Sequence, residues 1–306
     1  MIVRKHLDYR KIIQAGWKRV ILLLLISIVV AIASRYYVRT DLAIDSLPAS
    51  ILGVALSILI GFRVNSAYER WWEARRLWGG LVNDSRSIAR QAVTFLVGAK
   101  SGDITEESIV EEKRKFVYRQ IAFVYALKNH LRKQDNLDEL KPFLDSTEFN
   151  YLTEQKNVPN AMLFLHARHL QQAVAKGLME DLHHLQIDGR INELCNAMGG
   201  CERIKNTVFP RQYSYYASMF IAIYSCFLPF ILVGQSGWIT IPFTVLIGFI
   251  FFALDSIAKG IENPFENSFN DTPMTSICRT IEINLRQMLD EKEIPAPVQP
   301  VNGFLY

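Results

Sequence analysis

The chain lacks the short motifs that mark most enzymes and nucleic-acid-binding proteins. Its 306 residues contain no Walker-type or GxGxxG phosphate loop, no GxSxG turn and no HExxH zinc motif. The net charge is only +4, and no basic stripe is present to follow a nucleic-acid backbone. We therefore predict that the protein is not an enzyme, binds no cofactor and has no nucleic-acid partner.

Cysteine is also scarce, and its placement excludes a disulfide scaffold. The four residues form no CxxC pair and have no histidine at metal-binding spacing: Cys195, Cys201, Cys226 and Cys278. We interpret them as free thiols in a reducing or membrane environment. His166 and His169 lie three residues apart on a helical stretch, but no acidic or cysteine ligand is near them in sequence. We expect solvated helix-face histidines there rather than a metal site.

Apolar residues are abundant, and they are concentrated in four blocks. Half of the residues are hydrophobic, and the blocks are Val20–Ala33, Ala49–Phe62, Tyr213–Val233 and Trp238–Leu254. Trp17 and Tyr37 flank the first block, and a helix between them rises about 30 Å, the thickness of the hydrocarbon core. The sequence therefore predicts an all-α membrane protein with four transmembrane helices and a helical cytosolic region.

The first block has a second interpretation. Basic residues, an apolar run and Ala31-Ile32-Ala33 before Ser34 resemble a secretory signal with its cleavage site. We favour a retained helix because three more apolar blocks follow and because aromatic residues flank the first one.

The distribution of charge predicts the topology and the division of the chain. Basic residues precede the first block (Arg4, Lys5, Arg10, Lys11, Lys18 and Arg19), and the middle region and tail carry most of the rest. The positive-inside rule then places both termini in the cytoplasm. We predict two transmembrane helices in residues 1–72, a cytosolic helical region in 73–212, two more transmembrane helices in 213–258 and a cytosolic segment in 259–306. After Pro295 we expect a mobile tail.

The second block has the pattern of a helix that lines a pore. Val54, Ile58 and Phe62 recur every four residues and form one stripe, which continues into polar surface at Ser66 and Arg70. Packing against lipid or core explains most such stripes. However, the same helix carries Arg63 and Asn65 near membrane depth, where polar side chains face protein or water.

Several motifs along the chain together resemble the bestrophin family, and its bacterial branch most closely. They occur in the family's order and spacing: Gly61-Phe62, Glu69-Arg70-Trp71-Trp72-Glu73-Ala74-Arg75, Leu77-Trp78-Gly79, Cys201-Glu202-Arg203-Ile204 before Pro210 and Tyr213, and Gly260-Ile261-Glu262-Asn263-Pro264-Phe265.

The resemblance implies a homopentamer with one central pore in a lipid bilayer. The family's neck positions fall on Val54, Ile58 and Phe62, the same stripe that the helical periodicity selects. A second constriction at the cytosolic exit is implied near Leu185 to Ile187. Animal members follow Asn-Pro-Phe with an acidic run that clasps calcium, whereas this chain has only a degenerate loop with Glu266, Asn270 and Asp271. Calcium prefers six or more oxygen ligands with several carboxylates, so we predict no calcium activation.

Which ion passes is less constrained. Glu69 and Glu73 at the pore mouth favour cations, while Arg63 and Arg70 favour anions. The branch resemblance inclines the prediction to small monovalent cations such as sodium, with a chloride or anion channel as the alternative. A solute carrier and a membrane scaffold without conductance remain further alternatives, although neither internal repeats nor broken helices support a carrier.

Overall fold

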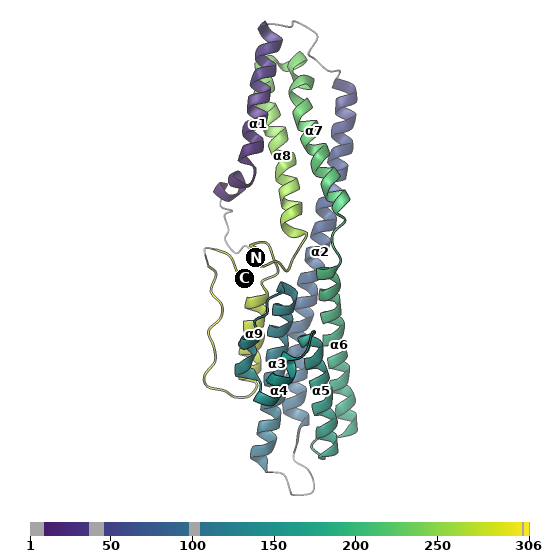
Figure 1. Ribbon diagram of the computed structural model, residues 1–306, viewed down its shortest axis with the longest axis vertical. Helices are drawn as coiled ribbons and strands as arrows, with labels where there is room; N and C mark the ends of the chain where they lie inside the picture. Colours follow the sequence, from purple (N-terminus) through teal and green to yellow (C-terminus); the bar gives the residue numbers. More distant parts are fainter. Residues whose placement is uncertain (1–8, 37–45, 98–104, 302, 306) are drawn as a thin grey trace. The chain divides into compact units, whose positions relative to one another are not determined.

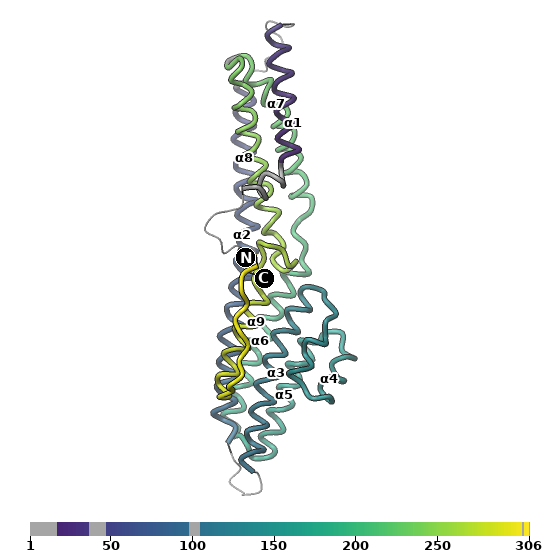
Figure 2. The backbone as a smooth tube through the Cα atoms, turned by 90° about the vertical axis from the view of Figure 1, so that its left-hand side faces the viewer, coloured from purple at the N-terminus to yellow at the C-terminus, as the bar shows by residue number. Residues whose placement is uncertain are grey.

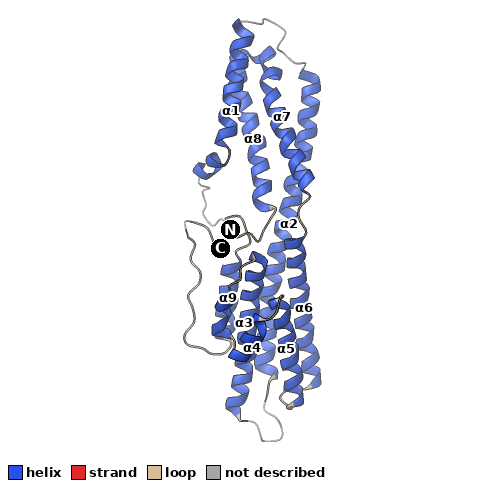
Figure 3. Ribbon diagram, in the orientation of Figure 1, coloured by secondary structure: helices blue, strands red, loops and turns tan. Residues whose placement is uncertain are grey.

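Every regular secondary-structure element that the structure describes is a helix. The computed structural model describes residues 9–36, 46–97, 105–301 and 303–305. Within these ranges no strand occurs, and Figure 3 shows helices joined by short loops. The helices are α1 (Tyr9–Tyr36), α2 (Ser46–Phe95), α3 (Glu106–Arg132), η1 (Leu137–Phe143), α4 (Ser146–Thr153), α5 (Val158–Ala175), α6 (Asp181–Asn206), α7 (Arg211–Ser236), η2 (Gly237–Ile239), α8 (Thr240–Ile261) and α9 (Met274–Gln287). Arg4, Lys5 and Tyr37, on which the topology prediction partly rests, lie outside the described residues.

The chain divides into two compact units, each described here by itself. The spanning unit comprises residues 4–71 and 208–263, and the bundle unit comprises 1–3, 72–207 and 264–306. Among the residues that the structure describes, four helices are long and apolar enough to cross a membrane, over residues 17–36, 47–95, 211–234 and 237–261. The prediction of four candidate spans is therefore confirmed. Helix α2 contributes its first half to the spanning unit and its second half to the bundle unit.

In the spanning unit, α1, α7 and α8 pack pairwise against one another (Figures 1 and 2). Leu23, Ile60, Ile221 and Phe252 form a small shared core with one residue from each of the four helices. Helix α1 runs without a break past Ala33 and buries Leu23 in this core. That continuity fits a retained span better than a cleaved signal.

The turn between α7 and α8 is short. Helix α7 continues to Ser236, and the chain leaves it at Gly237, with φ of +51°. A left-handed φ is accessible to glycine at no steric cost, so one glycine is sufficient to end the helix. The 3₁₀ turn η2 then leads directly into α8.

The bundle unit is built around α3, which is buried on nearly all sides. Thr105 caps its N-terminus, because its side chain accepts a hydrogen bond from the Ser108 amide. From Phe116 to Asn129 every residue of α3 is buried. The polar residues among them are paired: Gln120 donates to Ser85, and Lys128 donates to Glu139 at 2.7 Å. Such pairing is what permits polar side chains inside a core.

The C-terminal segment does not match the predicted mobile tail. Phe304 is buried and contacts the Phe269 ring, with the ring centroids 5.8 Å apart. The backbones of Val301 and Phe304 exchange two hydrogen bonds of 2.9 Å. An aromatic anchor that the proline-rich composition did not reveal therefore fixes the end of the segment.

Candidate pore-lining helix

One face of α2 in the spanning unit is apolar and exposed. Val54 is 62% exposed, Ile58 55% and Phe62 66%. The residues that α2 buries lie on its other side and include Leu56, Ile60 and Arg63. Because an α-helix turns 100° per residue, spacings of four keep the stripe on one face while Arg63 lies on the other. The predicted stripe is thus a continuous surface that the single chain leaves uncovered.

Below Phe62 the exposed face becomes polar. Ser66 is exposed, and the Asn65 amide donates a 2.8 Å hydrogen bond to the Glu69 carboxylate one turn further along α2. Glu69 is exposed as well, which is compatible with the predicted role of a pore-mouth charge. Glu73 is half-buried. Its carboxylate accepts a 2.6 Å hydrogen bond from Arg203 on α6 within the bundle unit, which partly neutralises its charge. Arg70 is intermediate in exposure.

Arg63 is not available as a pore-mouth charge, which corrects the expectation from sequence. Its side chain is 1% exposed and pairs with the carboxylate of Asp255 on α8. The sequence contained a signal for this pairing, because Asp255 is the one acidic residue within the apolar parts of α1, α7 and α8 that the structure describes. A buried charge in a membrane segment requires a partner of opposite sign.

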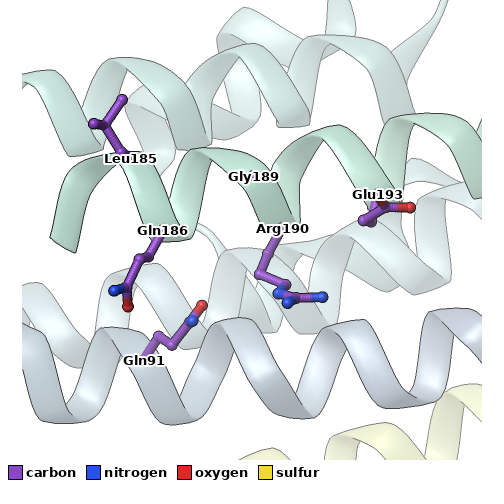
Figure 4. A pocket seen from close by; sticks show the side chains of 6 residues that line it. All are labelled: Gln91, Leu185, Gln186, Gly189, Arg190 and Glu193. Atoms are coloured by element: carbon purple, nitrogen blue, oxygen red, sulfur yellow. The ribbon is translucent and has the colours of Figure 1, made fainter. Parts of the chain in front are cut away.

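The two residues proposed for a second constriction point in different directions. Leu185 is 66% exposed on α6, whereas Ile187 is fully buried in the core of the bundle unit. On an α-helix, residues i and i+2 point about 200° apart, so the side chains of Leu185 and Ile187 cannot reach the same surface. Only Leu185 fits a lining position, and the assignment of Ile187 is corrected. A shallow cavity of about 420 Å³ is lined by Gln91, Leu185, Gln186, Gly189, Arg190 and Glu193. Figure 4 shows these residues on α2 and α6, with the Leu185 side chain pointing away from Gln91.

The expectation of solvated histidines on α5 is wrong. His166 is fully buried against the Phe116 ring, and His169 is 6% exposed. The Arg119 guanidinium lies 3.0 Å from Nδ1 of His169, and a Glu112 carboxylate oxygen lies 3.0 Å from Nε2. Burial, together with the positive charge of Arg119, lowers the pKa of His169 to about 4. His169 is therefore neutral at physiological pH and acts as a structural residue.

Comparison with known proteins identifies the family. The profile described as "Bacterial/Fungal Bestrophin protein" matches residues 9–287. The chain belongs to the bestrophin family. It is 36% identical over 280 residues to the voltage-dependent anion channel-forming protein YneE of Salmonella typhi, covering 92% of this chain and 88% of that protein. A relative from Ralstonia nicotianae with the same description is 31% identical over 303 residues, covering 96% of both chains.

Solved structures agree with this bestrophin assignment. A bacterial bestrophin homologue from Klebsiella pneumoniae superposes with a TM-score of 0.82 at 30% identity, covering 90% of this chain and 98% of that one. Family membership and the names of the relatives point to a channel rather than an enzyme.

The loop that corresponds to the bestrophin calcium clasp is closed on itself in this chain. The buried Asp271 accepts a hydrogen bond of 3.0 Å from the Ser268 amide and one of 2.5 Å from its hydroxyl. Glu266 pairs with Lys205 at 2.8 Å. In the part of the chain that the structure describes, no three His, Cys, Asp or Glu residues cluster in a way that would hold a metal. Both carboxylates of the loop already have partners, so the absence of a calcium site here stays a prediction.

Proposed function

We propose that this bestrophin forms a homopentameric channel for small monovalent anions, with Val54, Ile58 and Phe62 lining the neck of a single central pore. The observation that carries the proposal is the exposed apolar stripe on α2, which no other described part of the chain covers. Five copies around an axis would convert the stripe into stacked apolar rings. We further propose a bacterial inner-membrane location, because the relatives are bacterial proteins, with both termini in the cytoplasm, because basic residues precede the first apolar block.

The stacked rings would act as a gate. A narrow apolar ring empties of water, and an ion that has lost its hydration shell cannot cross it. A modest increase in width readmits water and therefore ions. Because none of the three side chains carries a charge, the neck controls passage without choosing the sign of the ion.

We favour anions over cations as the ions that the channel passes. The relatives from Salmonella and Ralstonia are named as anion channel-forming proteins, which supports the anion alternative over the cation inclination drawn from sequence. A carrier or a scaffold remains an outcome of the test below.

The test is the reversal potential of the purified protein in a planar bilayer under a sodium chloride gradient. A shift towards the chloride equilibrium potential is the expected result. A shift towards the sodium potential would retain the channel and overturn the anion assignment. Absence of current from correctly assembled protein would overturn the channel itself.

A further inference from the structure

Arg63 and Phe62 are neighbours in sequence with opposite surroundings. The Phe62 side chain is 66% exposed on the stripe, whereas Arg63 is 1% exposed on the buried side of the same helical turn. A guanidinium at membrane depth is costly, so its position depends on its partners. Any displacement of Arg63 is transmitted to Phe62, because the helical backbone between them is rigid.

The Arg63 guanidinium is held by groups from two other helices of the spanning unit. One nitrogen, Nη1, pairs with Asp255 on α8, and the other, Nη2, donates a 2.6 Å hydrogen bond to Ser214 on α7. Ser218 on α7 donates a 2.9 Å hydrogen bond to the same Asp255 carboxylate. The planar fork of arginine suits this arrangement, since it can bond two partners at once. Glu262 lies further away, at 3.8 Å.

Asp255 also contacts two other cations. Lys259, one turn along α8, lies 2.9 Å from its second oxygen, and Arg19 on α1 lies 3.7 Å from that oxygen. Both are partly exposed, with side-chain exposures of 40% and 51%. Of the three cations, only Arg63 belongs to the helix that carries the stripe. Lys259 and Arg19 can therefore keep Asp255 neutralised if Arg63 is replaced.

We propose that Arg63 and Asp255 form a tether that holds α2 back against α7 and α8 and so keeps the neck at Phe62 wide enough to open. This inference rests on the proposed function, since it assigns a positioning role within the same pore. The apolar rings favour closure by contact with one another, and the tether acts on the opposite face of α2. Loss of the tether lets α2 approach the axis, which narrows the neck.

The experiment compares three substitutions that each remove one cation from Asp255. Arg63→Met keeps the apolar stem and removes the tether, whereas Lys259→Met and Arg19→Met leave α2 untouched. For Arg63→Met we expect the open probability in bilayers to fall about three- to tenfold, the range for a coupling residue. The two control variants should retain the wild-type open probability. Arg63→Lys keeps the charge but offers one nitrogen, and we expect a smaller decrease.

A second readout does not depend on current. Ile58→Cys places a thiol in the neck, and its modification rate by a water-soluble reagent reports neck hydration. Cys195→Ala and Cys226→Ala, made in all variants, remove the exposed and half-exposed native thiols. We expect Arg63→Met to slow modification of the reporter by about the same factor as the open probability falls.

The outcomes separate the tether from the channel. Unchanged open probability and thiol rate in Arg63→Met overturn the tether, as does an equal decrease in Arg19→Met or Lys259→Met. A variant that loses only yield or thermal stability, while its assembled channels open normally, identifies Arg63 as merely structural. If Arg63→Met fails to assemble, the open probability of Arg63→Lys is used instead: a decrease supports the tether, and an unchanged value overturns it. If wild type passes no ion, the proposed function fails, and the thiol rate alone decides the tether.

Discussion

At the residue scale, this bestrophin separates charge and apolar surface within single helical turns. Phe62 and Arg63 lie side by side in sequence, one on an uncovered apolar stripe and the other inside the spanning unit. Burial of Arg63 is tolerated because Asp255, Ser214 and Ser218 surround it. The stripe is therefore free of charge not because α2 lacks charged residues but because its arginine points the other way.

Ile58→Ala should raise channel activity. Shortening this side chain widens the neck and lowers its hydrophobicity, so that water re-enters more readily; we expect at least about a threefold increase in open probability. Single-channel recording at matched protein incorporation measures it. Ile60→Ala is the matched control, since Ile60 is 2% exposed on the buried side of the same helix. It should lower stability without opening the neck, and a similar gain in both variants would contradict the gate.

His169 should make the bundle unit sensitive to acid. The pKa of His169 falls from 6.5 to about 4 on folding, so the unfolded chain binds a proton at a higher pH than the folded one. Stability is complete above pH 6.5 and is lost as the pH falls towards 4, by about 2 kcal/mol at pH 5. Burial also lowers the pKa of His166, with the same sign.

Thermal unfolding of the detergent-solubilised protein at pH 7.5 and pH 5 checks this prediction. His169→Gln offers an oxygen to Arg119 and an amide to Glu112 but does not titrate, so its two unfolding temperatures should lie closer together than those of wild type. His184→Gln, at a partly exposed histidine, should behave like wild type. Identical pH dependence in His169→Gln and wild type would show that the protonation of His169 is not linked to folding.

At the element scale, close helix packing in the spanning unit depends on small residues. A Cβ atom at Gly248 on α8 would lie 2.3 Å from Leu23 Cδ1 on α1, and Leu23 is 1% exposed. At Gly53 on α2 a Cβ atom would meet the Tyr224 hydroxyl at 2.5 Å. Small residues at such crossings allow helices to approach where no hydrophobic effect drives them together.

Gly248→Ala should therefore weaken the packing of α1 against α8. Overpacking a filled site typically costs about 1–3 kcal/mol, because the neighbouring side chain has no empty space into which to move. The unfolding temperature in detergent measures the loss. Gly80→Ala, where a Cβ atom meets nothing within 4 Å, is the control and should leave stability unchanged or raise it slightly. Equal effects of the two substitutions would argue against a packing cause.

The elements were largely predictable from sequence, and the contacts between them were not. Long apolar runs predicted four spans because a segment in lipid satisfies its backbone hydrogen bonds internally, which leaves helix as the simple solution. Helix α2 continues past Leu77 and Leu81 and ends at Phe95. No proline follows Pro48 within α2, and Gly79-Gly80 do not interrupt it.

Several of the predictions that failed depended on what lies beside a residue in space. Glu112 is 57 positions before His169, so the pair was invisible to a search for local metal ligands. Leu185 and Ile187 could not be told apart without knowing which face of α6 is buried. Periodicity gives the angle between two side chains, but only the packed structure shows which of them faces the core.

At the scale of the whole molecule, the uncovered stripe on α2 argues for assembly. Exposed apolar side chains at Val54, Ile58 and Phe62 continue into a polar face at Ser66 and Glu69, a boundary that a lipid-facing helix does not need at that depth. Several copies of the chain sharing one water-filled axis would account for both parts of the face.

The assembly should contain five copies. Size-exclusion chromatography with light scattering in mild detergent, corrected for bound detergent, should give a protein mass five times the 35.1 kDa of the chain. Chemical cross-linking at low protein concentration provides the independent check, with a ladder that stops at five. A monomeric mass under conditions that preserve helicity would rule out the ring.

The pairing of Arg63 with Asp255 also has a consequence for biosynthesis. The two residues are 192 positions apart, and a chain made at ~5–20 residues per second completes Asp255 about 10–40 s after Arg63. Throughout that interval Arg63 lacks the carboxylate that pairs with it in the folded chain, and an unpaired charge at membrane depth is costly. We therefore expect α2 to insert stably into the bilayer only after α7 and α8 have been made. When ribosomes are stalled before residue 255, α2 should remain extractable from the membrane.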